Sequence, residues 1–197
     1  MNRALIAGIF VGGNSERMGS PKGLLSHGKT TLIERWVALF EQMRVRSVLV
    51  GARAEYAHLG VPMIDDDATA VGPCAGLSAL FSHVVAVDGR GEGYAIVVAC
   101  DMPYVPRHLV ERLRDMPDGA AVAARRANLW EPFFARYDPE LVRPVLKNRI
   151  AKKQFDLQGI LKDTHASELP MSVAELSLLD DWDSPSDIPR SPGQSEP

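Results

Sequence analysis

The chain has 197 residues, with 22 Lys and Arg against 25 Asp and Glu, and its formal net charge is −3. This length suits one α/β domain, and the lack of a basic excess argues against a nucleic-acid partner. No apolar run approaches the roughly 20 residues that span a membrane, and the first apolar stretch has no clear signal-peptide cleavage site. We therefore expect a cytoplasmic protein with no nucleic-acid and no membrane partner.

The N-terminal region predicts a buried strand and then a long polar loop. Residues 4–11 form a short apolar run, which is typical of a parallel strand covered on both faces. Residues 12–29 are rich in Gly, Ser, Lys and Arg, and loops of this length in a compact domain are usually functional. A helix is expected to begin at Thr31, because Thr31 and Glu34 have the spacing of a capping box.

Strands and helices are expected to alternate along the rest of the chain. Apolar runs predict strands at 47–51, 61–64, 94–100, 120–124 and 133–137, and a last strand end at 178–179. Helices are expected to begin near Pro73, Pro106 and Asp138. This alternation predicts an α/β fold with a doubly wound, mostly parallel central sheet. We expect one domain over residues 1–189 and a disordered tail over 190–197.

Polar side chains follow several of these strands, and such sheets bind ligands outside the carboxyl ends of their strands. Gly12 and Gly13 let backbone N–H groups approach an anion, and Arg17 and Lys22 add positive charge. This combination favours a triphosphate site over a surface loop with incidental charges. Neither the P-loop pattern nor the glycine pattern of dinucleotide-binding proteins is present.

Aspartates supply candidate metal ligands and nucleoside contacts. Asp101 follows an apolar run, where a carboxylate can hold Mg²⁺ together with substrate phosphates or can cap the next helix. Asp181 and Asp183 alternate around Trp182, so both face one side if the segment is extended, and they could add a metal ligand or cap a helix. The run Asp65-Asp66-Asp67 either binds a ribose or base or forms a solvated turn.

Five segments resemble, in order, the motifs of the MobA-like nucleotidyltransferases. Residues 10–25 closely resemble the family pattern Leu-x-Ala-Gly-Gly-x-Ser-x-Arg-Met-Gly-x-x-Lys-x-Leu, which is highly specific. The other four are weak singly and strong together, and they span the chain to about residue 188: Gly72-Pro73-Cys74-Ala75-Gly76, Cys100-Asp101-Met102-Pro103, Glu131-Pro132-Phe133-Phe134-Ala135-Arg136-Tyr137 and Asp181-Trp182-Asp183-Ser184-Pro185.

The resemblance implies a Rossmann-like, three-layer nucleotidyltransferase fold and transfer of GMP from GTP to molybdopterin, with Mg²⁺ as cofactor and pyrophosphate as product. It also implies transient contact with molybdenum cofactor enzymes or chaperones. The expected catalytic residues are Arg17, Lys22 and Asp101, and the expected metal ligands are Asp101 and Asp183. The expected nucleotide-binding residues are Phe10, Val11, Gly12, Gly13, Lys22, Gly51, Asp65, Asp66 and Asp101.

Three departures from the family pattern leave alternatives open. Val11 replaces an alanine, Gly51 stands where guanylyltransferases often carry an asparagine, and Asp183 replaces another asparagine. GTP is therefore the favoured nucleotide, and the alternative is a CTP-dependent enzyme acting on molybdopterin or on a sugar or polyol phosphate. A non-catalytic nucleotide-binding or cofactor-carrier protein is the rival from another class. Seven basic residues offer charge for a phosphate of the acceptor: Arg125, Arg126, Arg143, Lys147, Arg149, Lys152 and Lys153.

Overall fold

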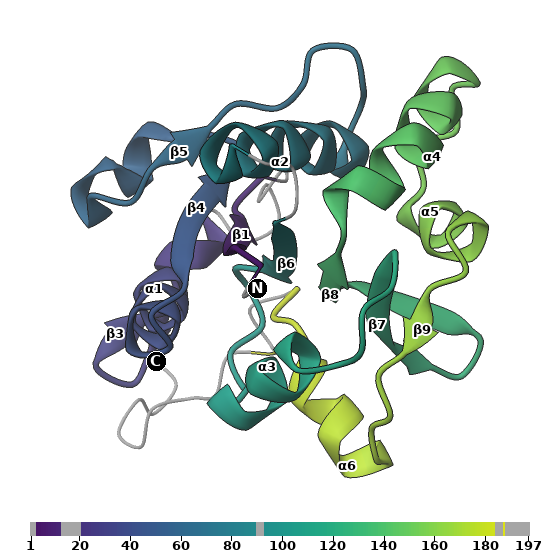
Figure 1. Ribbon diagram of the computed structural model, residues 1–197. Coiled ribbons are helices and arrows are strands. Elements are labelled where there is room, and N and C mark those ends of the chain that lie inside the picture. Colours follow the sequence, from purple (N-terminus) through teal and green to yellow (C-terminus); the bar gives the residue numbers. More distant parts are fainter. Residues whose placement is uncertain (1–2, 13–20, 90–92, 184–186, 188–197) are drawn as a thin grey trace.

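A seven-stranded sheet lies at the centre of the computed structural model, which describes residues 3–12, 21–89, 93–183 and 187 (Figure 1). The strand order is β5-β4-β1-β6-β8-β7-β9. β1, β4, β5 and β6 run parallel, β8 is antiparallel to both β6 and β7, and β9 is parallel to β7. The predicted α/β fold with a mostly parallel sheet is confirmed. The strands are β1 (Leu5–Phe10), β4 (Arg46–Val50), β5 (Met63–Ile64), β6 (Tyr94–Ala99), β7 (Ala121–Arg126), β8 (Leu129–Tyr137) and β9 (Ser167–Glu168).

Helices cover both faces of the sheet and complete three layers (Figure 1). Ala7 and Ile9 of β1 face one core, whereas Ile6 and Phe10 face the other, which is the alternation of a strand buried on both sides. Within the described ranges no helix is both long and apolar enough to cross a membrane. The first core lies under α1 (Leu32–Gln42) and α3 (Arg107–Arg114), and the second under α2 (Pro73–Asp88), α4 (Pro139–Ala151) and α5 (Leu157–Asp163).

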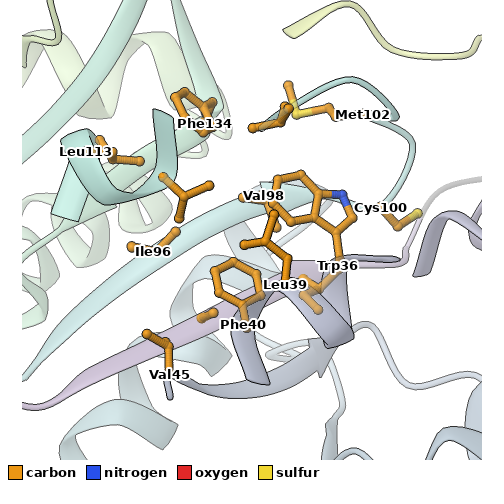
Figure 2. Packing of buried hydrophobic residues seen from close by; sticks show 14 of the residues in the cluster. Trp36, Leu39, Phe40, Val45, Ile96, Val98, Cys100, Met102, Leu113 and Phe134 are labelled. Carbon is orange, nitrogen blue, oxygen red and sulfur yellow. The ribbon is translucent and has the colours of Figure 1, made fainter. Parts of the chain in front are cut away.

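The core beneath α1 and α3 extends to the carboxyl end of β6 (Figure 2). Trp36 and Phe40 of α1 stack with ring centroids 5.6 Å apart and pack with Val98 of β6. Cys100 and Met102 belong to the same buried cluster. Each large apolar side chain of this kind contributes about 1.5–3 kcal/mol on burial. The chain is thus held firmly on both sides of residue 101.

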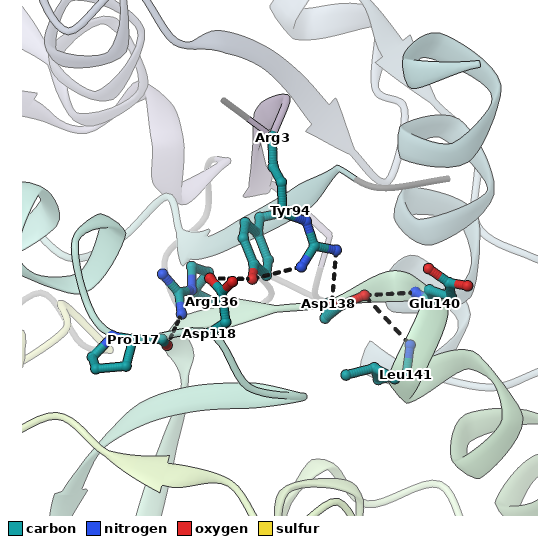
Figure 3. A network of polar contacts seen from close by, with 8 residues as sticks. All are labelled: Arg3, Tyr94, Pro117, Asp118, Arg136, Asp138, Glu140 and Leu141. Atoms are coloured by element: carbon teal, nitrogen blue, oxygen red, sulfur yellow. Dashed lines mark hydrogen bonds and ion pairs between the residues drawn. The ribbon is translucent and has the colours of Figure 1, made fainter. Parts of the chain in front are cut away.

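A polar network lies at the opposite end of the strands, where β1 and β6 begin (Figure 3). The guanidinium groups of Arg3 and Arg136 both lie over the ring of Tyr94, at 3.9 and 4.5 Å from its centroid. Tyr94 donates a hydrogen bond to Asp118, and Arg3 forms an ion pair with Asp138 at 2.7 Å. Asp138 also accepts hydrogen bonds from the first turn of α4, so it is the predicted cap of that helix.

Two predictions made for segments near the chain ends are corrected. The expected loop 12–29 is shorter, because its second half forms a 3₁₀ turn at Lys22–Leu24 and a hairpin of β2 (Ser26–His27) and β3 (Thr30–Thr31). Gly28, with φ of 68°, supplies the left-handed turn residue that such a hairpin requires. Residues 178–179, expected to end a strand, instead belong to a 3₁₀ turn that directly follows the capped helix α6 (Val173–Leu176). The predicted tail 190–197 lies outside the described residues.

Candidate active site

A cavity of about 310 Å³ opens at the carboxyl ends of β1, β4 and β6. After β1 the chain continues to β4 on one side, whereas β6 pairs with the other side of β1. The connections therefore diverge between β1 and β6, and open α/β sheets bind ligands at this kind of switch point. The cavity is lined by Phe10, Val11, Gly12, Lys22, Val50, Asp66, Gly72, Pro73, Ala99, Cys100, Asp101, Phe133 and Asp181.

Two glycines beside the cavity bring backbone segments close together. Gly51 has φ of 86°, and a Cβ there would lie 3.1 Å from the backbone N of Gly12. A Cβ on Gly76, in the first turns of α2, would lie 2.6 Å from the Phe10 ring and 3.2 Å from an Asp66 carboxylate oxygen. A side chain at Gly51 would press on the backbone of Gly12, and one at Gly76 would press on Phe10 and Asp66, which line the cavity.

Asp65 and Asp66 are both exposed, and Asp66 is the one of the three consecutive aspartates that lines the cavity. Burial raises the pKa of Asp66, and the neighbouring charge of Asp65 raises it further. Asp67 has a structural role, because it accepts hydrogen bonds from Ser78 at 2.5 Å and from Thr69. Of the two aspartates expected to face a nucleoside, Asp66 is the one that lines the cavity.

Lys22 lies at the charged end of the cavity between two carboxylates. Its Nζ donates to Asp101 Oδ2 at 2.8 Å and to Asp183 Oδ1 at 2.5 Å. Burial lowers the pKa of Lys22, but the hydrogen bonds to Asp101 and Asp183 outweigh burial, and the net effect is a raised pKa. Lys22 therefore stays protonated at neutral pH and brings a fixed positive charge to the cavity.

Three carboxylates gather around this lysine. One oxygen from each of Asp101, Asp181 and Asp183 lies within 4.8 Å of the others. Burial raises the pKa of Asp181, and the charges of Asp183 and Asp101 raise it further, so negative charge is crowded here. Carboxylate oxygens are the donors that Mg²⁺ and other hard cations prefer. The donor chemistry and the crowded charge both fit a divalent cation.

Some expected site residues cannot be placed in the cavity. Gly13 and Arg17 lie outside the described residues. Two of the basic residues considered for the acceptor are engaged elsewhere: Arg126 pairs with Glu131 and Asp180, and Arg149 pairs with Asp156 and Asp163.

Phe133 is a cavity residue that the sequence reasoning missed. Its ring meets the Phe10 ring edge-on at 5.3 Å, and so joins the carboxyl end of β1 to the middle of β8. The sequence did carry a signal for it. Phe133 and Phe134 are neighbours in a predicted strand, so their side chains must face opposite sides of the sheet. Phe134 is fully buried in the first core, whereas Phe133 faces the second core and the cavity.

Comparisons with known proteins show which family the chain resembles. The family model described as MobA-like NTP transferase domain matches residues 7–166. A probable molybdenum cofactor guanylyltransferase of Pelotomaculum thermopropionicum is 28% identical over 81% of this chain and 77% of its own length. Another, from Carboxydothermus hydrogenoformans, is 29% identical over 93% of this chain and 92% of its own length.

Solved structures show the same fold. Molybdopterin-guanine dinucleotide biosynthesis protein A from Archaeoglobus fulgidus has a TM-score of 0.72 at 23% identity, covering 92% of this chain and 94% of that chain. A 4-diphosphocytidyl-2C-methyl-D-erythritol synthase has a TM-score of 0.67 at 12% identity, with 95% of both chains covered. With the family model matching most of its length, the chain belongs to the MobA-like NTP transferase family and is a nucleotidyltransferase.

Proposed function

We propose that this protein transfers GMP from GTP to molybdopterin and releases pyrophosphate. The observation that carries the proposal is the meeting of Lys22, Asp101 and Asp183 at one end of a cavity on the sheet's switch point. A nucleotidyltransferase needs positive charge and metal-binding carboxylates beside the phosphates of its nucleotide. The names of the guanylyltransferase relatives support this choice of nucleotide and acceptor.

The nucleotide is proposed to lie with its base and ribose near Asp66 and its phosphates near Lys22. The backbone of Gly12 is exposed at the cavity, so its N–H can approach a phosphate oxygen. Pro73 begins α2 at the cavity wall, and the positive end of that helix dipole favours negative charge.

Asp66 supports guanine as the base. An ionised carboxylate is an acceptor-only group with two oxygens. Guanine presents two adjacent donors, its N1–H and its amino group, whereas cytosine presents only an amino donor on the corresponding edge. Gly51 is the observation that favours the CTP alternative, because it stands where guanylyltransferases often carry an asparagine. An asparagine in its place would carry a Cβ against the backbone of Gly12.

Asp101 and Asp183, with Asp181 beside them, are proposed to hold Mg²⁺. The bound ion would supply positive charge opposite the phosphate oxygens.

The proposed reaction is a direct displacement at the α-phosphorus. A phosphate oxygen of the acceptor attacks, the bond to the β-phosphate oxygen breaks, and pyrophosphate leaves. The protein contributes by positioning the two substrates and by neutralising charge. Lys22 turns from its carboxylate partners toward the phosphates, where its charge stabilises the transition state. Arg17 is proposed from the sequence as a second cation of this kind.

Pyrophosphate release tests the proposal. The protein is incubated with Mg²⁺, molybdopterin and either GTP or CTP, and each nucleotide is also tested without an acceptor. We expect release with GTP plus molybdopterin and little with the other combinations. Faster release with CTP would establish the cytidylyl alternative. Absence of release with either nucleotide and with molybdopterin or sugar and polyol phosphates would favour a carrier protein.

A further inference from the structure

Three aromatic side chains meet beside the carboxylate cluster. The ring of Trp182 lies 5.7 Å from that of His27 and 6.2 Å from that of Tyr104, and the rings of His27 and Tyr104 are 5.8 Å apart. The Trp182 indole also donates a long hydrogen bond of 3.4 Å to the Tyr104 hydroxyl. We call these three residues the aromatic cluster.

Each member of the aromatic cluster belongs to a segment that carries a charged residue of the site. His27 lies in the hairpin that follows Lys22, and Tyr104 lies in the loop that begins at Asp101. Trp182 lies between Asp181 and Asp183. The cluster therefore joins three segments that are distant in sequence, and these are the segments whose charges meet in the cavity.

Trp182 is the best-anchored part of its segment. Residues 181–183 belong to no helix or strand that the structure describes. Trp182 is only 2% exposed, and its backbone N–H donates to the carbonyl of Asp101 at 3.0 Å. The Asp183 side chain, in contrast, is 68% exposed. The Trp182 ring is buried while the two flanking carboxylates gather with Asp101 on the other side of the segment, as alternation along an extended segment requires.

We propose that Trp182, held by His27 and Tyr104, is a positioning residue that sets Asp181 and Asp183 against Asp101 and Lys22. The inference rests on the proposed function only in taking these carboxylates as the divalent-cation site. Residues that orient metal ligands from behind typically change metal affinity about 10–100-fold when they are replaced. Loss of the Trp182 ring should therefore weaken cation binding, because the two flanking carboxylates lose their fixed place.

The test measures Mn²⁺ binding to the full chain by electron paramagnetic resonance, next to the melting temperature. Trp182→Leu removes the ring, and Trp182→Phe restores an aromatic ring at the same position. The matched control is Phe81→Leu, which replaces a fully buried aromatic side chain of α2 that packs near Tyr137 with a smaller apolar one. Tyr104→Ala, at a residue that is 37% exposed, carries the same test if Trp182→Leu does not fold.

We expect Trp182→Leu to raise the Mn²⁺ dissociation constant about 10–100-fold. Trp182→Phe should bind Mn²⁺ much as the unsubstituted protein does, and Phe81→Leu should lower the melting temperature with unchanged Mn²⁺ affinity. Equal Mn²⁺ affinity in Trp182→Leu and Phe81→Leu would overturn the inference.

The two proposals can fail separately. If the unsubstituted protein binds Mn²⁺ and Trp182→Leu weakens that binding, the positioning role stands even where GTP and molybdopterin give no pyrophosphate. If the unsubstituted protein and Asp101→Asn both fail to bind Mn²⁺, the cation site and the positioning role are both overturned.

Discussion

At the residue scale, Lys22 joins the two acidic segments of the site. Its ammonium group is shared by Asp101 and Asp183, and its side chain is 21% exposed. A lysine between two carboxylates compensates part of their charge before a nucleotide arrives. In the proposed mechanism, the same lysine would become available to phosphate oxygens once a bound cation takes over that compensation.

Lys22→Ala should lower kcat about 10²–10³-fold, the usual result of removing one group that stabilises charge in a transition state. The control is Lys29→Ala, which removes an exposed lysine from the neighbouring hairpin. Steady-state pyrophosphate release measures both variants. A kcat for Lys22→Ala equal to that of Lys29→Ala would remove Lys22 from the catalytic machinery.

Gly51→Ala tests how tightly the cavity is built. The left-handed conformation at φ of 86° costs an alanine about 1–2 kcal/mol, and the new Cβ would press on Gly12. We expect lower stability and a higher KM for GTP. The control is Gly60→Ala, which has φ of 64° and open space around the new Cβ. It should lose similar stability by chemical denaturation without a change in KM; a raised KM in both variants would speak against the contact with Gly12.

At the element scale, the sequence predicts what depends on local signals. The capping box at Thr31 is confirmed, because its side chain accepts from Glu34 N and the Glu34 carboxylate accepts from the Thr31 backbone N–H. Long apolar runs gave β1, β4 and β6 within a residue or two. Two-residue β9 could not be found this way, because it exists through its pairing with Val122 and Ala123. The place of Phe133 likewise depends on the register between β8 and β6.

Thr31→Ala should reduce the free energy of unfolding by about 1 kcal/mol, the usual cost of losing an N-terminal cap. The reason is that the Glu34 backbone N–H, now bonded to the Thr31 hydroxyl at 3.3 Å, loses its partner. Thr30→Ala, at an exposed neighbouring position, is the control. Urea denaturation measures the free energy of unfolding of both variants. Equal values for Thr31→Ala and Thr30→Ala would contradict the role of the cap.

The ion pair between α3 and α6 predicts a pH dependence. Arg112 and the Ser172 backbone lower the pKa of Glu175 to about 2 from its ordinary 4.5. A depressed pKa in the folded state means that the stabilisation is present above about pH 4.5 and is lost as the pH falls toward 2. The difference in urea midpoint between the unsubstituted protein and Glu175→Gln should therefore shrink between pH 6 and pH 3. A difference that is constant over this range would show that the charge of Glu175 contributes nothing.

At the scale of the whole molecule, the two ends of the parallel strands have different roles. The amino-terminal ends of these strands carry the polar network, in which Arg3 pairs with Asp138, Asp118 accepts from Tyr94, and Arg136 lies over the Tyr94 ring. The carboxyl ends of the strands carry the cavity, where negative charge is crowded around one lysine. The polar network and the cavity are separated because the strands are parallel, so the loops after β1, β4 and β6 all lie at the same end of the sheet.

This separation explains how much of the site could be predicted. Asp66 and Asp101 follow the parallel strands β5 and β6, so the prediction of a parallel sheet places both at the carboxyl ends of the strands, where the cavity lies. The approach of Asp181 and Asp183 depends on a segment beyond the sheet, and alternation around Trp182 predicted only that they share a side. The anchoring by His27 and Tyr104 is tertiary packing, for which the sequence offered no local signal.

Transfer of the α-phosphorus tests the central claim most directly. GTP labelled at the α-phosphorus is incubated with the protein, Mg²⁺ and molybdopterin, and the label is followed by chromatography, with Asp101→Asn as the matched control. We predict that the label moves into a molybdopterin product in step with pyrophosphate release, and that Asp101→Asn slows this transfer about 10²-fold or more. Label that stays in GTP, or that enters the product equally fast with Asp101→Asn, would contradict the account.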